Sequence, residues 1–140
     1  MKNVLGCLSM AAVAVLLAAP VSAQTITLKA SVPFDFVVGG HTTPAGDYML
    51  STTGGMGLLQ VQNVGTGIIP AVVTTNKADG PSDGSGAYLT FNRYGGDYFL
   101  AGIWDGSGAG GRSIPMSNAE REKAKSASGK PKVVMVLARR

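Results

Sequence analysis

Polar and apolar residues alternate over much of this chain, which is the pattern of β-strands with one buried face. Between Thr25 and Val32, the apolar residues Ile26, Leu28 and Ala30 are each separated by a polar residue. Further short segments rich in β-branched and aromatic residues follow, and they are residues 34–38, 47–53, 58–64, 68–75, 87–93, 97–104 and 132–138. The pattern therefore predicts about eight short strands.

Glycines indicate how two of these strands connect. Gly95-Gly96 separates residues 87–93 from residues 97–104, and such a two-residue connection is typical of a tight hairpin. Residues 97–104 are apolar at nearly every position, so we expect this strand to lie centrally in its sheet, with both faces covered.

Prolines and polar stretches limit where strands can continue. Pro33 and Pro70 have no amide hydrogen for a strand ladder, so each indicates a bulge or a sheet edge. Three polar or glycine-rich stretches are expected to be loops, and they are residues 39–46, 76–86 and 106–111.

One helix is predicted in the C-terminal part of the chain. Residues 119–127 are mostly good helix formers, Ser117 is placed to cap the first amides, and Glu120 has the spacing of a capping box. Apart from Met116, its apolar side consists only of alanines, so we expect a surface helix that buries little.

Composition agrees with a small all-β fold. The sequence has 20 Gly and 7 Pro among 140 residues, and only 14% of its residues are charged. We expect a small antiparallel barrel or a two-sheet sandwich of about eight short strands, with one short surface helix near the C-terminus. A single β-domain is expected over residues 24–140, in which residues 111–130 form a helix-bearing basic connection and residues 132–138 the final strand.

Residues 1–23 have the features of a cleavable secretory signal. Lys2 precedes an apolar run from Val4 to Ala19, and small residues stand before Gln24. Lipidation at Cys7 fits less well because the apolar run follows this residue, and the run is shorter than the ~20 residues that a spanning helix needs. We therefore expect a periplasmic or secreted chain that begins near Gln24 and has neither a cysteine nor a transmembrane segment.

Charge is distributed unevenly along the expected mature chain. Residues 24–111 carry three basic and six acidic side chains, a net charge of −3, whereas residues 112–140 carry eight basic and two acidic ones, a net charge of +6. The basic end suits contact with an envelope polymer, an anionic surface or a protein partner, although a solvated basic face is the simpler interpretation. It lacks the interleaved aromatic residues of a nucleic-acid interface, so we expect no nucleic-acid partner.

Motif-like sequences in the chain do not assemble a reactive centre. Residues 80–84 have the letters of a hydrolase nucleophile elbow, but a strand follows them where a helix is needed, and His41 lies upstream. Residues 106–111 resemble a dinucleotide loop but lack the surrounding βαβ unit. Asp79 and Asp83 leave a weak calcium site open, although a proline occupies a ligand position. We expect no catalytic residue, structural metal or cofactor.

Aromatic and basic residues in the second half of the chain form the candidate binding surface. Aromatic side chains on strands can line a sugar- or peptide-binding face, although alternating aromatics also serve as core or cross-strand partners. The candidate residues are Tyr88, Tyr94, Tyr98, Trp104, Arg112, Lys130 and Lys132.

Two short segments resemble the opening signature of small exported bacterial proteins. Residues 32–40 read V-P-F-D-F-V-V-G-G, and residues 44–48 read P-A-G-D-Y. This arrangement is similar to the V-P-F-x-F strand and the P-A-G-x-Y turn of a group of small exported bacterial β-proteins of unknown function. The resemblance implies a compact exported β-domain and transfers no catalytic residue.

Together these observations favour an exported, non-enzymatic β-domain that acts by surface contact or binding at the cell envelope. A small-ligand-binding β-barrel carrier is the alternative, because the expected strand number and late helix resemble those of carrier barrels. A hydrolase is a further alternative, and it requires a cleft that gathers His41 with an Asp and a Ser.

Overall fold

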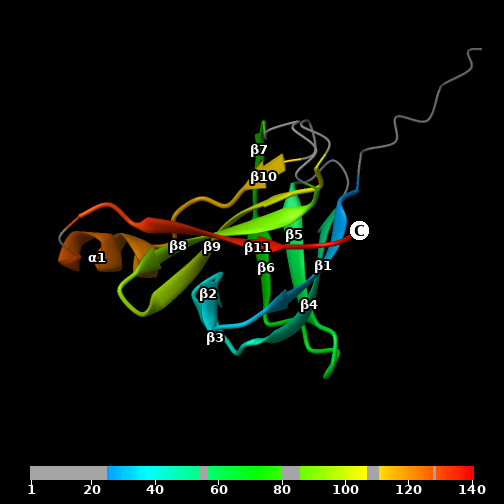
Figure 1. The fold of residues 1–140 in the computed structure, drawn as a ribbon, viewed down its shortest axis with the longest axis horizontal. Coiled ribbons are helices and arrows are strands. Elements are labelled where there is room, and N and C mark those ends of the chain that lie inside the picture. The colour runs from blue at the N-terminus through cyan, green and yellow to red at the C-terminus, as the bar shows by residue number, and fades with distance from the viewer. Residues whose placement is uncertain (1–24, 54–56, 80–85, 107–110, 128) are drawn as a thin grey trace, which may run out of the picture.

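The computed structural model describes residues 25–53, 57–79, 86–106, 111–127 and 129–140, which form two β-sheets and one short helix (Figure 1). Sheet A has four antiparallel strands in the spatial order β1 (Thr27–Val32), β4 (Gly46–Thr53), β5 (Leu58–Asn63) and β6 (Ala71–Thr74). Sheet B has the spatial order β11 (Lys132–Leu137), β8 (Tyr88–Tyr94), β9 (Asp97–Trp104), β10 (Gly111–Ser113) and β7 (Asn76–Ala78). Strand β2 (Phe36–Val38) joins β9 in parallel, and β3 (His41–Thr43) pairs with β2.

The two sheets meet at both of their edges. At one edge the chain passes from β6 directly into β7, and these strands lie end to end in Figure 1. At the other edge Lys29 of β1 and Arg139 exchange two backbone hydrogen bonds, with N···O distances of 2.7 and 2.9 Å. The described strands thus form two joined sheets and not a single closed barrel, which confirms the expected all-β class.

The main strands follow the sequence pattern. The residues of β1 alternate between exposed and buried, and the β8–β9 hairpin turns at Gly95-Gly96 with Tyr94 opposite Asp97. Strand β9 lies inside sheet B, and β6, which follows Pro70, is an edge strand of sheet A. The predicted helix is present as α1, which spans Asn118–Ser126 and so lies one residue earlier than the predicted 119–127.

Three segments in which no strand was expected contain strands: two lie in expected loops, and one lies at the start of the expected helix-bearing connection. These strands, β3, β7 and β10, each have three residues and bring the number of strands in the described part of the chain to eleven. A three-residue strand is too short to show a periodic pattern. Its conformation is determined by the strands with which it pairs, and its own sequence gives no signal. Strand β10, for example, is held between β7 and β9.

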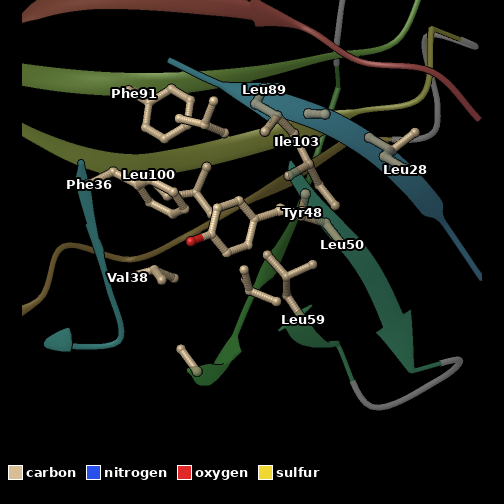
Figure 2. Packing of buried hydrophobic residues seen from close by; sticks show 14 of the residues in the cluster. Leu28, Phe36, Val38, Tyr48, Leu50, Leu59, Leu89, Phe91, Leu100 and Ile103 are labelled. Atoms are coloured by element: carbon tan, nitrogen blue, oxygen red, sulfur yellow. The ribbon is translucent and has the colours of Figure 1, made fainter. Parts of the chain in front are cut away.

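The core fills the space between the two sheets. Both sheets contribute apolar side chains from their facing sides, and Tyr48 lies in the middle of them in Figure 2, with Phe36, Leu59 and Leu100 around it. Tyr48 is 1% exposed, and its hydroxyl donates a hydrogen bond to the carbonyl oxygen of Pro44 at 2.5 Å. A tyrosine that bonds back to the preceding backbone in this way fixes the direction in which a chain enters a sheet.

The signature residues that resemble those of small exported proteins build this corner. The carboxylate of Asp35 accepts a hydrogen bond from the amide of Ala45 at 2.9 Å, which ties the two halves of the signature together. Phe36 packs edge-on against Tyr48 of sheet A, with ring centroids 5.3 Å apart, and against Phe91 of sheet B at 5.4 Å. The role of these residues that the structure supports is therefore packing.

The predicted signal, residues 1–23, lies outside the described residues and stays a prediction. Among the residues that the structure does describe, no helix has the length and apolar character needed to cross a membrane.

Candidate functional site

The structure distributes the seven candidate residues over both faces of sheet B. Alternate residues of a strand point to opposite faces, and the even-numbered residues of β8 point away from the core. Tyr88 and Tyr94 therefore lie on the outer face of sheet B. Tyr88 stands directly opposite Trp104 of β9, and the two rings stack with centroids 5.3 Å apart. This is the cross-strand pairing that the sequence left open as an alternative to a ligand surface.

Trp104 lies flat against sheet B. A Cβ atom added to Gly102 would stand 2.4 Å from Cη2 of Trp104, and one added to Gly111 would stand 2.5 Å from its Nε1. The indole therefore occupies the space that a side chain at Gly102 or Gly111 would need. Among the described residues, the buried Nε1 of Trp104 has no hydrogen-bond partner.

Tyr98 and Arg112 belong to the opposite, inner face. Tyr98 stacks on Phe34, with ring centroids 3.8 Å apart, and the guanidinium of Arg93 lies 5.4 Å from the centre of the tyrosine ring. Arg112 pairs with Ile103 in the β9–β10 ladder, and its Nη2 lies beside Gly57, which precedes β5 of sheet A. These two residues do not join the outer aromatic pair.

Lys130 and Lys132 lie at the start of β11 and are exposed. Arg139 and Arg140 follow the same strand, and the side chain of Arg140 donates hydrogen bonds to the carbonyl oxygen of Asp105 at 2.8 and 3.1 Å. Strand β11 is therefore bounded by basic residues at both ends.

Between these basic residues, β11 exposes an apolar stripe. Val133 is 64% exposed, Met135 57% and Leu137 72%. Their neighbours Val134 and Val136 are half-buried and pack on the core. Charges that flank an apolar strand protect it from aggregation, and the structure shows β11 paired with β8 on one side.

The backbone of the same three residues faces the open edge of β11. The amide of Ala138 donates to Ala87 beside β8 at 2.9 Å, whereas Arg139 bonds to Lys29 on the opposite side. Because the bonding direction alternates along an antiparallel strand, even-numbered residues of β11 bond to β8 and odd-numbered residues point away. Val133, Met135 and Leu137 therefore offer both side chains and backbone groups at this edge.

A cleft of ≈ 480 Å³ opens where β1 and β11 diverge from the Lys29–Arg139 bridge. Its walls include Ser31 of β1 and Leu137 of β11, and Val64, which is 54% exposed, also lines it. The cleft lies beside the last residues of the β11 edge.

A second cleft of ≈ 410 Å³, which we call the Glu120 groove, lies between β2, β6, β9 and the segment that enters α1. Glu120 lines it and is only 4% exposed. The Glu120 carboxylate oxygen Oε1 accepts hydrogen bonds from Nδ2 of Asn92 at 2.9 Å and from the hydroxyl of Tyr94 at 3.4 Å. Burial, followed by the charge and the hydrogen bond of Glu120, raises the pKa of Tyr94 above its usual 10.0.

The sequence prediction missed this role of Glu120. The spacing from Ser117 indicated a capping box, and the Ser117 hydroxyl does accept a hydrogen bond from the Glu120 amide at 3.2 Å. The glutamate side chain, however, turns to the outer face of sheet B and not back to the helix start. Glu120, and not an alanine, is the buried residue of α1, which corrects the expected apolar side.

The motif-like segments do not form a described site. His41 lies exposed on β3 opposite Val38, and Asp79 is exposed. Residues 80–85, which include Ser82 and Asp83, and residues 107–110 lie outside the described residues. Within the described part of the chain, no group of three or more His, Cys, Asp or Glu side chains could hold a metal ion.

Fold and surface thus define an all-β, two-sheet domain with an open edge strand and a groove that contains a buried carboxylate. Comparisons with protein-family models, with curated proteins and with solved structures find no match.

Proposed function

We propose that this protein is an exported, non-enzymatic domain that acts at the cell envelope by binding an extended segment of a partner protein along β11. The observation that supports the proposal is the open edge of β11, where exposed apolar side chains and outward-facing backbone groups belong to the same three residues. Partners that add a strand to an open edge use both features, the backbone for affinity and alternate side chains for specificity.

Charge indicates which kind of segment fits. A second copy of β11, paired in either direction, would bring basic residues opposite basic residues, because Lys130 and Lys132 precede the strand and Arg139 and Arg140 follow it. Like charges directly opposite each other destabilise a strand pair. We therefore infer a partner segment with alternating apolar residues and acidic residues at its ends.

The cleft beside β11 supports the same geometry. Below the Lys29–Arg139 bridge the two strands separate, so a bound strand would continue the ladder that this bridge begins. Val64 and Leu137 would contact its apolar side chains.

The test uses a short synthetic peptide in which Val and Thr alternate between glutamates at both ends. On peptide addition we expect amide hydrogen exchange to slow at Val133, Met135 and Leu137, because these amides become hydrogen-bonded. The substitution Met135→Pro removes an outward-facing amide without breaking the ladder to β8, and it should weaken peptide binding by about tenfold or more.

Two controls separate backbone pairing from other effects. Met135→Ala keeps the amide and should lose less affinity than Met135→Pro, and a peptide with lysines in place of the glutamates should bind more weakly than the acidic one. Equal binding of both peptides, or unchanged binding by Met135→Pro, would contradict the proposal.

Export is tested separately, by fractionating cells that express the full chain and sequencing the N-terminus of the recovered protein. We expect a start near Gln24 outside the cytoplasm. An intact start at Met1 in the cytoplasmic fraction would refute export and leave the binding experiment unaffected.

A further inference from the structure

The Glu120 groove combines apolar and polar side chains, and the one charged residue in its lining, Glu120, is buried. Val72 of β6 and Met116 at the entrance to α1 line it and are 55% and 40% exposed. Val38 of β2 and Phe99 of β9 also line it. Thr74 and Ser117 line the groove as well, and apolar walls with a few placed polar groups are the usual form of a site that selects a ligand by its functional groups.

The carboxylate of Glu120 has neutral donors but no cationic partner. Asn92 and Tyr94 both bond to Oε1, and no hydrogen bond between described residues uses Oε2. Neither ion pair within the described part of the chain includes Glu120. Lys123, one turn further along α1, is bound to Asp97 with an Nζ···Oδ2 distance of 2.7 Å.

A buried carboxylate without a counter-charge is energetically unfavourable, and a bound cation relieves that cost. We propose that the Glu120 groove binds an aliphatic ammonium group, with the charged nitrogen at Glu120 and the hydrocarbon chain along Val72 and Met116. The ammonium completes the hydrogen bonding of the carboxylate, and the alkyl chain covers exposed apolar surface. This proposal does not rest on strand addition at β11, because the residues of the two sites are different.

Hexylammonium is the probe, and hexanol of the same chain length is its uncharged control. In calorimetric titrations of the purified protein at neutral pH, we expect millimolar binding of hexylammonium and at least about tenfold weaker binding of hexanol. Nα-acetyl-lysine methylamide distinguishes the two sources of the group: tighter binding than hexylammonium points to a lysine side chain of a protein, and weaker binding points to a free amine.

The substitution Glu120→Gln removes the charge and keeps an oxygen that can accept from Asn92 and Tyr94. It should weaken hexylammonium binding by about tenfold or more and leave hexanol binding unchanged. The matched control is Glu122→Gln on the same helix, because the side chain of Glu122 is 75% exposed. This variant should bind hexylammonium as the parent does.

Equal affinity for hexylammonium and hexanol would overturn the proposal, as would equal losses in the Glu120→Gln and Glu122→Gln variants. If Glu120→Gln does not fold, the binding of both probes to Met116→Ser is compared with their binding to the parent protein. We expect Met116→Ser to weaken binding of both six-carbon probes, and unchanged binding of both would refute the groove as the site.

Discussion

The hydroxyl of Tyr48 is predicted to stabilise the fold through its hydrogen bond to the carbonyl oxygen of Pro44. The substitution Tyr48→Phe removes only this oxygen and leaves the ring in the core with Phe36. The hydrogen bond to the carbonyl oxygen of Pro44 is then lost, and water can take the place of the hydroxyl because Pro44 is exposed.

The loss of this hydrogen bond predicts that Tyr48→Phe lowers the free energy of unfolding by about 1 kcal/mol, within a range of about 0.5–1.5 kcal/mol. For a domain of this size, that corresponds to a fall in Tm of about 4 °C. A loss of this size leaves a folded protein, because single domains are stable by about 5–15 kcal/mol.

Urea unfolding, followed by circular dichroism, measures the change. The control is Tyr98→Phe, because Tyr98 stacks on Phe34 but its hydroxyl forms no hydrogen bond to another described residue. This control should change the stability by less than about 0.5 kcal/mol. A Tyr48→Phe protein as stable as the parent, or a Tyr98→Phe loss of equal size, would refute the account of this corner.

Two further predictions concern the outer face of sheet B. Because the pKa of Tyr94 is raised above 10.0, the folded protein keeps a phenol proton that the unfolded chain releases, so the contribution of Tyr94 to the free energy of unfolding should be constant below pH 10 and fall as the pH rises above it. Urea unfolding at stepped alkaline pH checks this, and Tyr94→Phe should flatten the dependence. Gly102→Ala should displace the indole of Trp104 and shift its fluorescence to the red, an unambiguous signal because the chain has one tryptophan. Gly96→Ala, where an added Cβ meets nothing within 4 Å, should leave the spectrum unchanged.

The sequence was sufficient to predict the long strands and the helix because each has its own periodic pattern. Strand β1 alternates over its whole length, and the hairpin at Gly95-Gly96 is fixed by a local turn. The short strand β10 has no such signal, because β7 and β9 on its two sides determine it. Pairing between distant segments is therefore the part of the fold that the pattern could not predict.

The candidate sites were predictable only in part, for a related reason. The apolar run of the last strand and its basic flanks were visible in the sequence, but its position at a sheet edge depends on which strands lie beside it. The seven aromatic and basic candidate residues do not form one surface, because Tyr98 and Trp104 point to opposite faces of β9. Glu120 could not be identified, since its burial requires α1 to lie against Asn92 and Tyr94.

The bridge between Lys29 and Arg139 also bears on how fast the molecule reaches its final state. These two residues are 110 positions apart, so this contact cannot form until residue 139 has been synthesised. Proteins dominated by such distant pairings fold in about milliseconds to seconds, much more slowly than helical bundles. We therefore expect the fold of the nascent chain to stay incomplete, with this edge of β1 unpaired, until residue 139 is available.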